Sequence, residues 1–305
     1  RAGEADLVLQ PRPEQVEELA AREGFRAIVK PSRQFSFIAW NGRREDLADP
    51  RVRKALAMAI DRQEILEGFR RGYGRLGTGP ISPFHWSYDQ ALEPLPYSPD
   101  SAVALLAEAG ISDRDGDGTL EGPDGAPFAI ELKLPAGSDY NRDIAESVRG
   151  DLAAIGVDIR TRPTEVNTLI ADVTSPERRF DAFLFGWAGD FRLDLHDIFH
   201  SSAVGGPYQF ASYANPEADS LIDRASTEMD RSRAIPLWRR LNEILRDEQP
   251  WTVIFYQTDA FLLRERVEGV EMDIRGAFVS LADWWLEPSN PRAAGAAADS
   301  MAAGS

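Results

Sequence analysis

The chain has 305 residues, of which 34 are Lys or Arg and 50 are Asp or Glu, so its formal net charge is −16. This acidic surplus argues against a nucleic-acid partner or an anionic membrane surface, because no basic face is available to neutralise phosphates. The absence of cysteine excludes disulfides, thiol nucleophiles and thiolate metal sites. No apolar run approaches the roughly 20 residues of a membrane span, so we expect no direct membrane insertion of this segment.

The first third of the chain predicts helices joined to short strands. Apolar spacing indicates helices at 13–22, 50–72 and 98–110, and strands at 25–30 and 35–40. The clearest start is Asp49 as N-cap followed by Pro50 in the first turn. Residues 72–89 are rich in Gly, Pro and aromatics, which predicts an irregular segment packed across a surface. His85, beside Trp86, is expected to be packed there and not catalytic.

The rest of the chain predicts a mixed α/β fold. A strand at 128–134, a helix at 144–155 and a strand at 157–162 form a predicted parallel βαβ unit. Further helices are predicted at 166–173, 195–199, 219–229 and 231–247, and further strands at 252–255, 260–263 and 267–272. Residues 287–305 are dominated by Ala, Gly, Ser and Asn without periodicity, so we expect a disordered tail.

Residues 181–190 read DAFLFGWAGD and are the most informative segment. A short buried strand delivers Trp187, a Gly turn and the carboxylate of Asp190 to its carboxyl end. Ligands of open sheets bind beyond the carboxyl ends of strands, so this end is a candidate ligand site. The alternative is a core strand that turns at Gly189, with Asp190 capping the next helix.

Two segments have the spacing of metal ligands. Residues 113–124 place Asp113, Asp115 and Asp117 at positions 1, 3 and 5 of a calcium loop, with Gly118 at position 6. Position 12 is Asp124 where a calcium loop has Glu, and Gly-Pro precedes it. Calcium is therefore a candidate ligand, and a polar turn leading into the next strand is the alternative.

His196 and His200 are four residues apart on a predicted helix, with Asp194 and Asp197 nearby. This spacing could bind zinc or nickel. Because the sequence offers no third convincing ligand, we interpret these residues as a surface helix and predict no metal site.

Several segments together resemble one family. They read DPRVRKALAMAIDR at 49–62, GYG at 72–74, GPISP at 79–83, YSPDSAVALLAEAG at 97–110, GWAGD at 186–190 and YANPEADSLI at 213–222. In this order they closely resemble the extracytoplasmic solute-binding proteins of family 5, the peptide- and nickel-binding subunits of ABC importers. The resemblance covers about residues 3–286.

The resemblance implies a two-lobed α/β fold of the periplasmic-binding-protein type that closes on a solute. It divides the chain into 1–38, a residual part of the larger lobe, 39–185, the smaller lobe, and 186–286, the return into the larger lobe. Family members are longer at the N-terminal side. We therefore expect the N-terminal half of the larger lobe to be missing and the chain to be a fragment or a shortened product.

The resemblance also implies ligand-binding residues. Asp190 matches the aspartate that anchors a peptide's terminal ammonium, Trp187 would supply an aromatic wall, and Gly186, Ala188 and Tyr140 are further candidate contacts. Dipeptide binders hold the ligand carboxylate with an arginine two residues before a Tyr-Asn pair. Here that position is Ser138, which argues against such a carboxylate clamp. Longer peptides, sugars or other solutes are therefore candidate ligands as well.

The predicted function is therefore the extracytoplasmic or periplasmic substrate-binding component of an ABC importer. Its partners would be a peptide or similar small solute and a membrane permease. The alternatives are the ligand-sensing domain of a regulator, an oligosaccharide-binding importer subunit and, last, a glycoside hydrolase. No nucleophile elbow, phosphate-binding loop or zinc-protease motif occurs, so we predict no enzyme activity and no catalytic residues.

Overall fold

The computed structural model describes residues 5–9 and 11–287, so the predicted tail from residue 288 onward lies outside the described residues. The chain forms two compact units. One comprises residues 31–257, and the other comprises the described residues up to 30 and from 258 onward. The lobe boundaries expected at 38/39 and 185/186 concern a whole two-lobed protein and remain a prediction.

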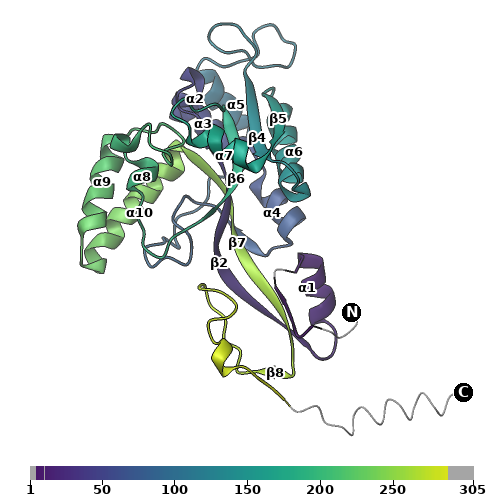
Figure 1. Ribbon diagram of the computed structural model, residues 1–305. Coiled ribbons are helices and arrows are strands. Elements are labelled where there is room, and N and C mark those ends of the chain that lie inside the picture. Colours follow the sequence, from purple (N-terminus) through teal and green to yellow (C-terminus); the bar gives the residue numbers. More distant parts are fainter. Residues whose placement is uncertain (1–4, 10, 288–305) are drawn as a thin grey trace, which may run out of the picture. The chain divides into compact units, whose positions relative to one another are not determined.

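The unit of residues 31–257 is a mixed α/β structure built on one sheet (Figure 1). Its sheet order is β3-β7-β2-β6-β4-β5. The strands are β2 (Phe25–Trp40), β3 (Gly74–Leu76), β4 (Ala129–Pro135), β5 (Asp158–Thr164), β6 (Ala182–Ala188) and β7 (Trp251–Arg264), of which β2 and β7 continue into the other unit. The helices are α2 (Glu45–Ala48), α3 (Pro50–Ala59), α4 (Arg62–Arg70), α5 (Pro99–Glu108), α6 (Asp139–Ala154), α7 (Val166–Thr174), α8 (His196–Phe199), α9 (Pro216–Thr227) and α10 (Arg231–Glu248), with a 3-10 turn at Ser201–Ala203.

Two hydrophobic cores cover the two faces of this sheet. Side chains alternate between faces along a strand, so β2 sends Ile38 and Trp40 to one core and Phe35 and Phe37 to the other. The first core contains residues of α3, α4, α5 and α6, and the second contains residues of α7, α8, α9 and α10. Both faces of the central strands are therefore buried, which explains their nearly continuous apolar sequence.

The predicted βαβ unit is confirmed. Strands β4 and β5 pair in parallel, from Ala129 opposite Asp158 to Pro135 opposite Thr164, and α6 connects them. Helix α6 begins five residues before the predicted start because the hydroxyl of Ser138 accepts a hydrogen bond from the Asn141 amide, at 3.2 Å, and caps it. The first turn of α6 is mostly polar, so the spacing of apolar residues could not predict this earlier start.

The helix predicted over 50–72 is wrong in one respect, because it is two helices. Asp49 caps α3 as predicted, accepting from the Arg51 amide at 2.8 Å. The chain then becomes extended at Ile60, and Asp61 caps α4 by accepting from the Glu64 amide at 2.9 Å. The apolar stripe continues across this break, so periodicity alone could not reveal it.

Two pairs of predicted strands are each one continuous strand in the structure. Residues 25–30 and 35–40 form the single strand β2, and 252–255 and 260–263 form the single strand β7. Strands β2 and β7 are neighbours in the sheet. Their pairing keeps both strands extended through the less apolar residues, where the apolar pattern of the sequence is interrupted. The strand predicted at 267–272 is confined to β8 (Val267–Glu268).

The second unit is smaller. It contains β1 (Leu7–Leu9), α1 (Pro13–Ala20), β8, a 3-10 turn at Leu281–Asp283 and β9 (Trp285–Leu286). Strand β1 pairs antiparallel with the end of β7, with Leu7 opposite Leu263, and β8 pairs with β9. Phe261, Met272 and Ala277 form its buried cluster.

Arg62 is a buried cation that joins α4 to the strands and the loop beside it. It is 4% exposed, and its guanidinium donates to the carbonyls of Gly77 at 3.0 Å, Val253 at 3.1 Å and Leu95 at 2.6 Å. Burial lowers the pKa of Arg62 to about 10. The contact with three carbonyls compensates for its desolvation.

We predict that Arg62→Met lowers the free energy of unfolding by about 3 kcal/mol, because three buried carbonyls lose their donors. Urea unfolding followed by circular dichroism measures the change. Arg142→Met is the matched control, since the Arg142 side chain is 56% exposed and should cost less than about 0.5 kcal/mol. Equal losses in the two variants would contradict the prediction.

Candidate functional site

A cavity of about 50 Å³ lies at the carboxyl end of β6, within the unit of residues 31–257. The residues around it come from β2, the 80–85 segment, β6 and the loop after it, α8, and the start of β7. They are Phe35, Pro80, Ser82, Phe84, His85, Trp187, Gly189, Asp190, Arg192, Leu193, Asp194, Leu195, Ile198 and Trp251. The cavity therefore occupies the place at which the sequence predicts a ligand site.

Trp187 forms part of an aromatic wall. It lies opposite Phe35 in the antiparallel pairing of β6 with β2. Its ring meets those of Trp251, Phe210 and Tyr208 edge to face, with centroids 5.4, 6.2 and 6.2 Å apart. Such packing fixes the orientation of the indole, which lines the cavity as a rigid surface.

The loop after β6 is held by Arg33. The Gly189 amide donates to the Arg33 carbonyl at 3.0 Å, and the Arg33 guanidinium lies 3.4 Å from the Gly189 carbonyl. The same guanidinium stands over the Phe191 ring, 4.8 Å from its centroid. Pairing with β2 thus continues through Gly189, and the turn expected at this glycine comes after Asp190.

Asp190 is exposed at the cavity and has no hydrogen bond or ion pair with any residue that the structure describes. The interpretation of Asp190 as a helix cap is wrong, because α8 begins at His196 and the His196 amide donates to Asp194 at 3.2 Å. An unpartnered carboxylate beside an aromatic wall can accept a cationic or hydrogen-bond-donating ligand.

The other three candidate contacts lie elsewhere. Gly186 and Ala188 are exposed and, by the alternation along β6, belong to the sheet face opposite Trp187. Tyr140 packs against the first core with its ring edge to face with Phe69, at 6.4 Å, and burial raises its pKa to about 12. The structure therefore brings together Trp187 and Asp190 only. Ligand contacts by the other three remain predictions.

Sequence reasoning did not single out three buried polar side chains of the cavity as site residues. Ser82, His85 and Trp251 are 4%, 7% and 2% exposed. The Oγ of Ser82, the Nε2 of His85 and the Nε1 of Trp251 are buried and have no hydrogen-bond partner among the described residues. They come from segments far apart in the chain, so no local pattern could have joined them.

The protonation state of His85 follows from its contacts. The Ser87 amide donates to its Nδ1 at 3.3 Å, and the Ser87 hydroxyl lies 2.7 Å from the same atom. An amide only donates, so Nδ1 is an acceptor and the proton of the neutral ring is on Nε2. Burial, assisted by the positive charge of Arg231, lowers the pKa of His85 to about 4. His85 is therefore a neutral hydrogen-bond donor near pH 7.

Residues 1–215 match the model of the bacterial extracellular solute-binding proteins, family 5 (middle part). The oligopeptide-binding protein AppA of Bacillus subtilis is 32% identical over 254 residues, which are 83% of this chain and 47% of the relative. The chain belongs to family 5. It spans about half the length of the curated relatives it matches.

Other comparisons agree. A dipeptide-binding protein of Pseudomonas aeruginosa is 27% identical over 93% of this chain and 52% of its own length. The solved structure of Bacillus subtilis AppA in complex with a nonapeptide aligns with a TM-score of 0.82 and 28% identity, over 94% of this chain and 57% of that chain. The mixed α/β fold class is therefore confirmed, and solute binding is the property shared by the family.

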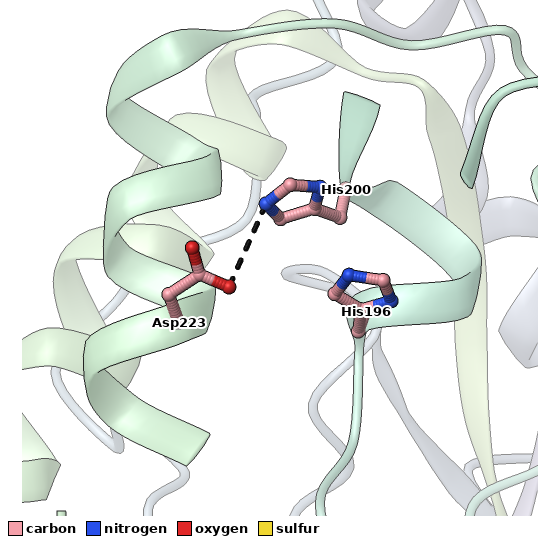
Figure 2. Close-up of side chains that lie close together, drawn as sticks. All are labelled: His196, His200 and Asp223. Carbon is pink, nitrogen blue, oxygen red and sulfur yellow. Dashed lines mark ion pairs between the residues drawn. The ribbon is translucent and has the colours of Figure 1, made fainter. Parts of the chain in front are cut away.

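The two histidines lie with a carboxylate from another helix. Figure 2 shows His196 and His200 near Asp223 of α9, and their ligand atoms lie within 4.8 Å of one another. The Nδ1 of His200, however, accepts from the Ser202 amide at 3.1 Å, so its Nε2 carries the proton and faces Asp223 at 3.6 Å. Asp223 is thus the third candidate ligand that the sequence did not reveal, and the absence of a metal site here remains a prediction from the sequence.

The acidic loop of residues 113–124 brings four carboxylates close together. Carboxylate oxygens of Asp113, Asp115, Asp117 and Glu121 lie within 4.8 Å of one another. Asp124, expected at position 12, instead accepts from the Ala126 amide at 3.0 Å within its own turn. The fourth carboxylate of this group is therefore Glu121 and not Asp124. Calcium binding by this loop remains a prediction.

We predict that His85 titrates with a midpoint of about pH 4, read from its imidazole ¹⁵N shifts. The unfolded chain binds this proton below about pH 6.5 and the folded chain only below about pH 4, so stability should fall as the pH decreases between these values. Urea unfolding at several pH values tests the slope, and His85→Phe should flatten it. An unchanged slope in that variant would contradict the assignment.

Proposed function

We propose that this chain is part of the substrate-binding component of an ABC-type importer, and that it binds peptides through Asp190 and Trp187. The observation that carries the proposal is that the cavity is lined both by the exposed carboxylate of Asp190, which has no partner among the described residues, and by the fixed ring of Trp187. Relatives named as oligopeptide- and dipeptide-binding proteins support the choice of ligand. Because the chain covers about half of these relatives, the membrane permease as partner and an extracytoplasmic location belong to the proposal.

The chemistry of the site suits a peptide amine. An ammonium placed against Asp190 would form a charge-assisted hydrogen bond, which is stronger than a neutral one. The indole of Trp187 adds an electron-rich face that attracts a cation. No helix in the described part of the chain is long and apolar enough to cross a membrane, so in this proposal a separate permease provides the path across the bilayer.

Binding without catalysis fits the cavity better than hydrolysis. Ser82 and His85 both line the cavity near Asp190 and Asp194, which is the residue set of a serine hydrolase. In such a triad, Nδ1 of the histidine donates to the aspartate. The Nδ1 of His85 instead accepts from Ser87, and no described carboxylate orients the ring. The activity that we propose is therefore solute capture.

We predict that acetylation of a bound peptide's terminal amine weakens binding at least roughly tenfold, whereas amidation of its carboxylate has a much smaller effect. The reason is that Asp190 accepts from the ammonium, while the hydroxyl of Ser138 is used to cap α6 and no arginine stands there. Calorimetry with the full-length protein measures both effects.

Asp190→Asn should reduce the affinity for the free peptide by a similar factor and abolish the effect of acetylation. Asp197→Asn is the matched control, because it makes the same change of charge on α8, where the Asp197 side chain is 81% exposed and outside the cavity. Equal sensitivity to both blocking groups would contradict the amine contact. Tight binding of an oligosaccharide without any binding of peptides would favour the sugar-binding alternative.

A further inference from the structure

We propose that His196, His200 and Asp223 bind one divalent transition-metal ion such as zinc, which cross-links the α8 segment to α9. We call these three side chains the histidine cluster. The sequence shows two histidines four residues apart but no third ligand, and the structure supplies the third from another helix (Figure 2). Neither histidine lines the cavity that contains Asp190, so the inference does not rest on the proposed function.

The spacing of the ligand atoms suits one small ion. Zinc lies about 2.0 to 2.2 Å from imidazole nitrogens and carboxylate oxygens, so two ligand atoms of a tetrahedral site are about 3.4 Å apart. The Nε2 of His200 lies 3.6 Å from Oδ1 of Asp223, and ligand atoms of all three side chains lie within 4.8 Å of one another. The side chains of His196 and Asp223 are 44% and 65% exposed, so small rotations of them can close the site around an ion.

A direct histidine–aspartate pair explains the cluster less well. At 3.6 Å, the Nε2 of His200 and the Oδ1 of Asp223 are farther apart than the roughly 2.7 to 3.2 Å of a hydrogen bond. Such a pair would also need only one histidine. Two of the chain's three histidines stand here, with their rings nearly parallel at 21° and their centroids 4.5 Å apart. Two imidazoles beside one carboxylate form a donor set that suits zinc, nickel and copper.

The charges around the cluster favour a divalent cation. An ion bound by two neutral imidazoles and the Asp223 carboxylate would keep one positive charge. A second carboxylate of α9, that of Asp219, lies 3.9 Å from the Nδ1 of His200 and can compensate for this charge. The Asp219 side chain is held there because it accepts from the Ser201 amide at 2.9 Å. The ion would therefore be electrostatically balanced by groups of α9.

Ser202 provides the second hydrogen bond that a metal-bound histidine needs. Its amide donates to the Nδ1 of His200 at 3.1 Å, so the neutral ring carries its proton on Nε2. An ion at Nε2 requires this proton to move to Nδ1, where the Ser202 hydroxyl, 2.8 Å away, can accept it. Metal-bound histidines usually donate their other N–H in this way. Because Ser202 is exposed, water can replace Nδ1 as the partner of its amide.

Calorimetric titration of the full-length protein with zinc chloride near pH 7 tests the proposal. We expect one zinc per chain at the cluster. His200→Ala and Asp223→Ala should each weaken this binding about 100-fold or more, because loss of an outer hydrogen-bond partner alone costs roughly 10- to 100-fold. Asp223→Ala serves if His200→Ala fails to fold, since the Asp223 side chain is 65% exposed.

Asp139→Ala is the matched control, because the Asp139 side chain is 84% exposed on α6 and outside the cluster. It should leave the zinc affinity unchanged. The acidic loop of residues 113–124 offers zinc only oxygen ligands, so a second measurement separates the two places. The imidazole ¹⁵N resonances of His196 and His200 should shift with zinc bound at the cluster and stay unchanged with zinc bound at the loop.

Each result decides the proposal. One zinc per chain, lost in His200→Ala and Asp223→Ala, kept in Asp139→Ala and accompanied by shifts of both histidine resonances, supports the histidine cluster. A zinc affinity that is unchanged in either ligand variant overturns it. Absence of zinc binding by the unmutated protein also overturns it and leaves the two histidines on a surface helix, as the sequence predicts. None of these results depends on peptide binding, so the proposed function is tested separately.

Discussion

The antiparallel pairing of β2 with β6 is the constraint on which the rest depends. Because side chains alternate across both strands, the pairing of Phe35 with Trp187 commits both rings to the same core, and their neighbours Ser36 and Gly186 to the opposite face. A shift of one residue would turn Trp187 away from the aromatic cluster. Burial of apolar side chains on both faces therefore fixes the register, and the register determines what stands at the end of β6.

Electrostatics at the site depends on which charges are already paired. In a chain of net charge −16, many carboxylates serve as caps or ion-pair partners. Asp49 caps α3, and Asp172 pairs with Lys133 at 2.8 Å, which lowers the pKa of Asp172. Asp190 has neither role among the described residues. Its carboxylate is therefore free to form the charge-assisted contact with a ligand cation that we propose.

The buried polar groups of this unit differ in whether they have hydrogen-bond partners. Arg62 meets its need for acceptors with three carbonyls of the chain. The donors of Ser82, His85 and Trp251 have no such partners among the described residues. The charged group is thus paired within the fold while the neutral ones are not, in line with the larger cost of burying an unpaired charge.

The sequence by itself determined the elements whose signals are local. Asp49 and Pro50 marked the start of α3, the βαβ unit followed from apolar periodicity, and GWAGD at 186–190 located the end of β6 and its carboxylate. Tertiary structure decided what depends on pairing between distant segments. The continuity of β2 and β7 arises from their neighbours in the sheet, and the cavity joins Ser82, Trp187 and Trp251 from three separate parts of the chain. Such contacts form through folding of the whole unit, so no local pattern encodes them.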